Sequence, residues 1–224
     1  KENSLSIFSQ QKITRGIFIT FEGPEGSGKS TQSKGIYEDL IRDGYDVLHT
    51  REPGGSILGE KIREILLAKD SIPLSSESEL LLFEAQRAQH ISELIKPAID
   101  QNKIVLCDRF NTATFAYQGY GLGMSIDDIK KVDSIATYGI SPDLTILLDL
   151  DTRIGLERAE AKGTPDRMEK RSIDFHNKVR QGYLLLAEKN PDKIKKVSVE
   201  ENKEDTYKKV KTIIYDFIER YKRK

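Results

Sequence analysis

The sequence predicts an α/β fold in which helices flank a parallel five-stranded sheet. Short apolar runs alternate with segments of helical periodicity along almost the whole chain. This alternation is typical of parallel strands joined by helices that cover both faces of a sheet. A glycine-rich turn follows the first run directly, and such sheets bind ligands beyond the carboxyl ends of their strands. We therefore expect a single domain over residues 16–224, preceded by an extension over residues 1–15.

Three strands are predicted in the first half of the chain. The run GIFITFE (16–22) is the first strand, and a helix follows from the glycine-rich turn to about Arg42. The second and third strands are DVLHT (46–50) and KIVLCD (103–108). The segments between these two strands predict two helices, over residues 57–67 and 77–100.

Two more strands are predicted in the second half. LTILLDL (144–150) is a fourth buried strand, and KIKKVSV (193–199) is a weaker fifth strand. Helices are expected over residues 125–138, from the end of the fourth strand to about Ala161, over residues 172–189 and at the C-terminal end. The last helix has an apolar stripe that we expect to pack against the sheet, formed by Tyr207, Val210, Ile214, Phe217 and Tyr221.

The bulk composition excludes several classes of protein. The 36 basic and 36 acidic side chains among the 224 residues cancel, which argues against a non-specific nucleic-acid binder. No apolar run approaches the roughly 20 residues of a membrane span, and the N-terminal segment lacks the apolar stretch of a secretion signal. The single cysteine, Cys107, cannot form an internal disulfide bond. These features predict a cytoplasmic protein without membrane or nucleic-acid partners.

The glycine-rich turn FEGPEGSGKST (21–31) fits the pattern G-x-x-x-x-G-K-[ST]. In this pattern backbone N–H groups surround phosphate oxygens, the lysine reaches the β- and γ-phosphates, and the hydroxyl group that follows binds Mg²⁺. The next helix points its positive end at the same site. The sequence therefore predicts that ATP or GTP binds with Mg²⁺ at Gly23, Pro24, Glu25, Gly26, Ser27, Gly28, Lys29, Ser30 and Thr31.

Three arginines are candidates for a second phosphate site. Arg51 and Arg109 follow the second and third strands, and Arg87 lies on the long helix between these strands. Guanidinium groups bind phosphate in a bidentate manner and stay charged at any working pH. Several of them beside a nucleotide loop predict a phosphate that belongs to an acceptor molecule. An ordinary ion pair on the surface or between helices is the alternative for each arginine.

The acid that would hold Mg²⁺ with Ser30 is predicted to be Asp108, which ends the third strand. Asp149 and Asp151 follow the fourth strand in a similar way and are the alternatives. Asp108 is preferred because Arg109 follows it immediately. A zinc site held by the protein is not expected, because the histidines are scattered at His49, His90 and His176.

At this point the motifs resemble a known family, the bacterial thymidylate kinases. FEGPEGSGKST, TREPGG, LLLFEAQR, CDRF followed by AYQG, PDLTILLDL and a DR-containing loop near Arg167 occur in the family's order and spacing over residues 16–220. The resemblance implies a three-layer P-loop nucleoside monophosphate kinase fold with a small lid over about residues 160–172. It also implies a homodimer that converts ATP and dTMP to ADP and dTDP, a step in dTTP biosynthesis.

The resemblance further implies which residues form the dTMP site. Phe83 would stack on thymine, Arg87 would bond its carbonyl group, and Tyr117 would crowd the 2′ position of the sugar. Thr114 and Gln118 would line the base pocket. Core packing is the alternative for both aromatic residues, since it is the more common role of such side chains.

The chain departs from the family pattern after Arg109. The family usually has Tyr or His at the position of Phe110, and it places a serine a few residues later, where this chain has Ala113. A polar tip and a hydroxyl group are therefore lost. We expect that activity is retained and that the fine geometry of the base pocket differs.

Glu25 poses a separate question, because a carboxylate is unfavourable among phosphates. By resemblance it faces the acceptor sugar and accepts a hydrogen bond from the 3′-OH; a solvent-facing carboxylate is the alternative. Some thymidylate kinases have an arginine in this loop that touches the γ-phosphate, and this loop has none. We therefore expect the lid to supply that charge, through Arg158 and Arg167 ahead of Lys162.

No general base is expected, because the acceptor phosphate is already largely ionised at pH 7. Catalysis is then alignment and charge neutralisation by Lys29, Arg109, Mg²⁺ and the lid. Two other functions remain open at this point. One is a kinase of another (deoxy)nucleoside or nucleoside monophosphate. The other is a non-enzymatic nucleotide switch, which the arginines after the second and third strands argue against.

Overall fold

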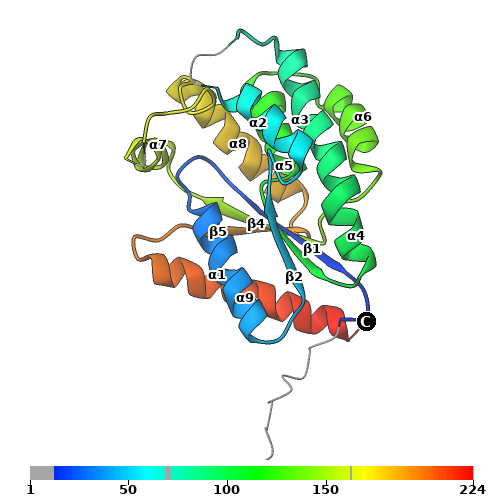
Figure 1. The fold of residues 1–224 in the computed structure, drawn as a ribbon. Helices are drawn as coiled ribbons and strands as arrows, with labels where there is room; N and C mark the ends of the chain where they lie inside the picture. Colours follow the sequence, from blue (N-terminus) through cyan, green and yellow to red (C-terminus); the bar gives the residue numbers. More distant parts are fainter. Residues whose placement is uncertain (1–12, 69–71, 162, 224) are drawn as a thin grey trace, which may run out of the picture.

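The computed structural model describes residues 13–68, 72–161 and 163–223, and Figure 1 shows their course. In chain order the elements are β1 (Ile17–Glu22), α1 (Lys29–Arg42), β2 (Val47–Arg51), α2 (Ile57–Leu67), α3 (Ser76–His90), η1 (Ile91–Ile95), α4 (Lys96–Asp100), β3 (Ile104–Asp108), α5 (Asn111–Thr114), η2 (Phe115–Gly121), α6 (Ile126–Thr137), β4 (Leu144–Asp149), α7 (Thr152–Glu160), α8 (Ile173–Lys189), β5 (Ile194–Ser198) and α9 (Lys203–Lys222).

Within the described residues, five strands form one sheet in the order β2-β3-β1-β4-β5, and every neighbouring pair is parallel. Strand β1 is central, so Ile19 lies opposite Leu106 of β3 and Leu144 of β4. Parallel neighbours require crossover connections, which the helices supply. The predicted α/β fold with a parallel five-stranded sheet is confirmed.

Helices α1 and α9 cover one face of the sheet (Figure 1). Alternate residues of the strands point to this face, and Ile17 and Ile19 of β1 pack in one cluster with Ile36 of α1. Burial of each such side chain stabilises the fold by roughly 1.5–3 kcal/mol. The predicted stripe of the last helix is confirmed, because its members belong to this cluster, buried at Val210 and Ile214 and partly buried at Tyr207, Phe217 and Tyr221.

The opposite face is covered by two groups of helices. Phe18 of β1 packs beneath η1 and α4, in a cluster with Ile91 and Ile95. Leu147 of β4 packs with Val179 of α8 and with residues of η2. Because side chains alternate along β1, its last residue also points to this face. The helices around the carboxyl ends of β1 and β3 on this face are therefore α3, η2 and α8.

Two segments differ from the predicted elements. The helix predicted over residues 77–100 is divided into α3, the π-helical turn η1 and α4. Pro97 lies at the start of α4, and its missing N–H removes one bond from the helical ladder at this point. Residues 111–121, for which the sequence predicts no element, form α5 and η2.

The predicted extension over residues 1–15 lies mostly outside the described residues, so its separation from the domain stays a prediction. Ile13 is described, and it is buried in the cluster beneath α1 and α9. Among the residues that the structure describes, no helix is long and apolar enough to cross a bilayer.

Candidate active site

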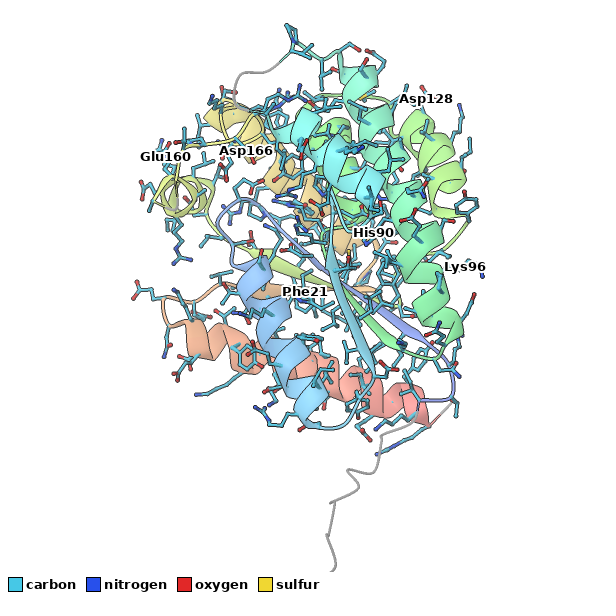
Figure 2. The ribbon with its side chains drawn as sticks, in the orientation of Figure 1. Phe21, His90, Lys96, Asp128, Glu160 and Asp166 are labelled. Carbon is cyan, nitrogen blue, oxygen red and sulfur yellow. The ribbon has the colours of Figure 1, made fainter. Side chains whose placement is uncertain are left out.

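A cleft of about 380 Å³ opens at the carboxyl ends of the central strands. Its walls come from the phosphate loop after β1, the residues after β2 and β3, the helices α3 and η2, and the lid segment, defined here as residues 163–172 between α7 and α8. Figure 2 labels Asp166 on this segment, between α7 and α8. Parts of the chain that are far apart in sequence thus meet where a parallel sheet binds ligands.

The phosphate loop has the backbone that its glycines allow. Gly26 and Gly28 have φ angles of 66° and 92°, which side chains of L-residues rarely adopt. A Cβ atom on Gly26 would lie 2.0 Å from the carbonyl oxygen of Gly155 in α7, so the loop and this helix are in direct backbone contact. Helix α1 begins at Lys29, directly after the loop. Its free N–H groups and positive end therefore face the cleft.

Lys29 is buried, and its Nζ donates to the carbonyl oxygen of Pro24 at 2.8 Å and to Oγ of Ser27 at 3.4 Å. Burial lowers the pKa of this ammonium group to about 8, and the positive charge of Arg109 acts in the same direction. The charge is thus held at the loop by two neutral oxygens. A phosphate group would offer it a stronger partner.

Ser30 and Asp108 meet across the cleft, where the serine Oγ donates to Oδ2 of the aspartate. The two other predicted candidates are engaged elsewhere: Asp149 accepts from Nε of Arg180 at 2.8 Å, and Asp151 accepts from the first turn of α7. A hydroxyl and a carboxylate oxygen are hard ligands that suit Mg²⁺, which keeps several waters and needs few protein ligands. Among the described residues, no group of three or more His, Cys, Asp or Glu forms a metal cage.

Arg109 links the end of β3 to the phosphate loop. Its Nη2 donates to Oε1 of Glu25 at 2.7 Å, and its Nη1 donates to the carbonyl oxygen of Gly23 at 3.2 Å. The same Oε1 accepts from the hydroxyl of Tyr117 at 2.5 Å. Burial alone would raise the pKa of Glu25, but Arg109 and Lys29 outweigh it and lower the pKa to about 2. Glu25 is therefore an ionised carboxylate inside the cleft.

A second carboxylate, Glu22, lies beneath the cleft, and the sequence reasoning missed it. It is fully buried and accepts hydrogen bonds from the backbone N–H groups of Phe110 and Ala113 at 2.8 and 3.2 Å and from the Tyr183 hydroxyl at 3.0 Å. Burial raises its pKa to about 7, although Arg109 lowers it. Its signal in the sequence was an acid at the end of an otherwise apolar strand.

Arg87 differs from its predicted environment. It lines the cleft, yet it is only 1% exposed. Its guanidinium donates to Glu52 at 2.9 Å and Glu84 at 2.6 Å and lies 5.2 Å above the ring of Phe110. Burial alone would lower its pKa, but these carboxylates raise it. Arg87 is thus already neutralised within the cleft wall and is poorly placed to bind a phosphate.

Two other arginines are better placed beside Arg109. Arg51 is exposed, lines the cleft and donates to Glu60 at 2.9 Å. Arg63, in α2, also lines the cleft and was missed by the sequence reasoning; it donates to the carbonyl oxygen of Pro53 at 2.8 Å. Burial and the positive charge of Arg51 lower the pKa of Arg63. This local excess of positive charge suits an anion. Spacing could have indicated Arg63, since it lies two turns inside a helix that starts near the cleft.

Four residues predicted to contact the base or the sugar of dTMP line one part of the cleft: Phe83, Thr114 and Gln118 at the base, and Tyr117 at the sugar. Phe83 is half-buried, while the other three are buried. Phe110 is fully buried and packs edge-on against Phe18, with 4.9 Å between ring centroids. The missing polar tip at this position is therefore replaced by core packing.

The lid arginines are not placed as expected. Arg167 donates to Glu79 of α3 and, at 3.2 Å, to the carbonyl oxygen of Leu66. A buried carboxylate attracts this guanidinium, so it lies behind the cleft wall. Arg158 is half-buried in α7, and neither arginine lines the cleft. The third predicted basic residue, Lys162, lies outside the described residues.

Comparisons with known proteins all lead to one family. The thymidylate kinase family model matches residues 21–210. A thymidylate kinase of Halothermothrix orenii is 51% identical over 78% of this chain and 85% of its own length. One of Clostridium novyi is 41% identical over 89% of this chain and 98% of its own length.

A solved structure gives the same result. The crystal structure of thymidylate kinase from Ehrlichia chaffeensis superposes with a TM-score of 0.71 at 34% sequence identity, over 91% of this chain and 99% of that one. The similarity in sequence and in structure therefore covers the sheet, the phosphate loop and the walls of the cleft.

Proposed function

The chain belongs to the thymidylate kinase family, and from that premise we infer that it transfers the γ-phosphoryl group of ATP to dTMP, giving ADP and dTDP. One observation supports this function most directly: a phosphate loop and several arginines line the same cleft. Donor and acceptor phosphates can then lie end to end. The protein needs to align them and neutralise charge, because an ionised phosphate requires no general base.

On the donor side, we propose that residues 23–31 hold the phosphates of ATP through backbone N–H groups. Lys29 would exchange its carbonyl partner, Pro24, for a β- or γ-phosphate oxygen. Charge that develops on the transferred group is opposed by this lysine and by the positive end of α1. Arg158 remains a proposed contributor from α7. Arg167 is the weaker candidate, because Glu79 already binds it.

On the acceptor side, we propose that Arg51 and Arg109 bind the dTMP phosphate, with Arg63 beside them. Phe83 would stack on the base, with Thr114 and Gln118 at its edge and Tyr117 against the sugar. Arg87 would form the floor of this pocket, and any bond to the base carbonyl would have to come from donors that its carboxylate partners leave free. Glu25 would accept a hydrogen bond from the 3′-OH.

We propose that Ser30 and Asp108 hold Mg²⁺ with the nucleotide. When bound, the metal would neutralise negative charge on the phosphates of the nucleotide. The Ser30 hydroxyl donates to the Asp108 carboxylate, so the two oxygens lie side by side in the cleft. The fit rests on the hardness of these oxygens and on their place beside the loop.

We also propose that the protein is a homodimer that acts in the cytoplasm. Helices α2, α3 and α6 lie side by side (Figure 1). They expose the large apolar side chains of Ile57, Leu58, Ile65, Leu81 and Ile135, and Tyr138 is exposed directly after α6. A second copy would cover such a surface with the same patch. A cytoplasmic location suits Cys107, a buried free thiol with a raised pKa. Light scattering of the wild type and of Ile57→Glu tests the dimer, because the variant should be monomeric.

The function is tested by coupled detection of ADP release with and without dTMP. Turnover should depend on dTMP and should be much slower with dUMP, dCMP, UMP or thymidine. Turnover that prefers another acceptor would support a different nucleoside or nucleoside monophosphate kinase. ATP hydrolysis that ignores every acceptor would support a nucleotide switch.

A further inference from the structure

The buried carboxylate that binds Arg167 joins the base pocket to the lid segment. Glu79, in the first turn of α3, is 1% exposed. Its Oε1 accepts from Nε2 of Gln118 at 2.9 Å. Its Oε2 accepts from Nη2 of Arg171 at 2.6 Å and from Nη2 of Arg167. One side chain therefore contacts α3, η2 and the lid segment at once.

This contact determines the orientation of the Gln118 amide. Both oxygens of Glu79 serve as acceptors, Oε2 for the two guanidinium groups and Oε1 for Gln118, so the atom that faces Oε1 is the amide nitrogen. A flipped amide would set its oxygen against the carboxylate and lose the bond. The remaining acceptor, Oε1 of Gln118, takes no hydrogen bond among the described residues, and Gln118 lines the cleft.

The two arginines hold the carboxylate in place from the other side. A buried carboxylate without a partner is costly, and two guanidinium groups on Oε2 neutralise it. Each guanidinium is itself fixed by a further contact. Arg167 donates to the carbonyl oxygen of Leu66 at 3.2 Å, and Arg171 lies 4.7 Å above the ring of Phe175. The carboxylate therefore has little freedom to turn its Oε1 away from the amide.

We propose that Glu79 is a positioning residue that sets base specificity by fixing the orientation of the Gln118 amide. Because the lid segment holds Glu79, base specificity then also depends on the lid segment. With its orientation fixed, the amide presents an acceptor oxygen to the acceptor pocket. That oxygen suits a pyrimidine with an N–H at ring position 3, as in thymine. It repels the cytosine ring, which has a lone pair at that position. This inference rests on the proposed function, because it assumes that a pyrimidine nucleotide occupies the cleft beside Gln118.

The experiment compares Glu79→Gln with Glu77→Gln, an exposed glutamate of the same helix. Calorimetric titration gives the dissociation constants of dTMP, dCMP and ATP for each protein. The wild type and Glu77→Gln should prefer dTMP over dCMP by about 100-fold or more, as expected where polar groups read a base edge. Glu79→Gln should reduce this preference to about tenfold or less and leave ATP affinity unchanged. Equal weakening of dTMP and dCMP would show a merely structural role and overturn the inference.

A second series keeps the test decisive if Glu79→Gln fails to fold. Arg171→Gln removes one of the two cations and should reduce the preference in the same direction, by a smaller factor. Gln118→Leu removes the amide and should by itself abolish the preference for dTMP over dCMP. Adding Arg171→Gln to Gln118→Leu should therefore change the ratio of the two dissociation constants no further. A preference that Arg171→Gln leaves intact, or a wild type without preference, would contradict the inference. A wild type that prefers dTMP in binding but shows no dTMP-dependent ADP release would instead contradict the proposed function.

Discussion

Arg109 and Glu25 form an ion pair of 2.7 Å between the end of β3 and the phosphate loop, and each side chain is only 17% exposed. The pair explains how a carboxylate is tolerated in a loop that binds anions. Arg109 adopts a left-handed backbone conformation with a φ of 67°, which directs its guanidinium back toward the loop. Glu25 is therefore not the solvent-facing residue of the alternative interpretation. It faces Arg109 and Tyr117 inside the cleft.

Glu25→Ala should weaken the use of dTMP and remove the sensitivity to the sugar hydroxyl. A hydrogen bond to a charged group contributes roughly 1.5–3 kcal/mol, so an analogue without the 3′-OH should lose about 10–100-fold in kcat/KM with the wild type. The same analogue should lose little with Glu25→Ala. Steady-state kinetics with both acceptors measures this double difference.

Tyr117→Phe is the control for this cycle, because it removes the other donor to Oε1 of Glu25 and keeps the carboxylate. It should retain the sensitivity to the 3′-OH. Equal losses on removal of the hydroxyl in the wild type and in Glu25→Ala would show that Glu25 does not bind the sugar.

Lys29→Met should abolish phosphoryl transfer and also change how stability depends on pH. The folded protein holds the pKa of Lys29 at about 8, below its ordinary value of 10.5. The unfolded chain therefore binds a proton that the folded chain lacks between these pH values, so wild-type stability rises with pH in this window. Below pH 8 the buried charge costs on the order of 3 kcal/mol, which the variant avoids.

Urea unfolding of the two proteins at pH 7, 9 and 10.5 measures this effect. The variant should be the more stable protein at pH 7, and the difference should shrink as the pH rises. Groups remote from Lys29 titrate alike in both proteins and cancel in the comparison. Glu22, whose pKa of about 7 is lowered in part by Lys29, does not cancel, so the change between pH 9 and 10.5 is the decisive part. A constant difference across the range would show that Lys29 is not destabilised by burial. Full transfer activity in the variant would remove the assignment of the phosphate loop.

Much of the fold was predictable because it depends on patterns that are local in sequence. The apolar runs that become β1, β3 and β4 are buried on both faces, so they read as strands without knowledge of their neighbours. The phosphate loop was equally clear, because its function requires fixed glycines. Residues 111–121 were missed because their helical turns depend on packing against α8 and on the carboxylate of Glu22, which accepts from the N–H group of Ala113 and from that of Phe110, just before them.

The site was predictable where the position of a residue after a strand is enough to place it in the cleft. It was less predictable where an ion-pair partner determines whether the side chain is available to a ligand. Asp108 and Arg109 follow a strand, and their position places them in the cleft. Arg87 and Arg167 look equally available in the sequence, but carboxylates neutralise both. Glu52 from a distant part of the chain and Glu84 of the same helix bind Arg87, and the distant Glu79 binds Arg167. No local pattern shows that Glu79 is buried and that Arg167 will bind it. Such pairings are set by tertiary structure, and they determine which arginine remains free for a ligand.

Arg51→Ala should weaken dTMP binding without affecting ATP. Arg51 is exposed at the edge of the cleft, and its ion pair with Glu60 lies at the surface, so its loss should change stability by at most about 1 kcal/mol. A charged hydrogen bond to the acceptor phosphate should be lost, which raises the KM for dTMP about 10–100-fold. Arg42→Ala is the matched control, because Arg42 is an exposed arginine paired with Asp39 away from the cleft. A raised KM for ATP with an unchanged KM for dTMP would show that Arg51 does not belong to the acceptor site.

Gly155→Ala tests the contact between α7 and the phosphate loop. Helix propensity alone would make alanine more favourable than glycine inside this helix by about 1 kcal/mol. The structure predicts the opposite result, because the new Cβ atom would lie 2.3 Å from the carbonyl oxygen of Glu25. The backbone at this point cannot yield as a flexible side chain would. The loop must shift, and with it the amides that surround the phosphates and the carboxylate that holds Arg109.

The expected result is a fall in kcat, a rise in the KM for ATP and a lower midpoint of urea unfolding. Glu157→Ala, an exposed change in the same helix, should leave all three quantities nearly unchanged. If Gly155→Ala were instead more stable and fully active, helix propensity would outweigh the contact, and α7 would not brace the loop. If only stability fell, the loop would be able to regain its geometry around bound ATP. Measuring activity and stability on one variant therefore separates the contribution of Gly155 to the fold from its contribution to the phosphate site.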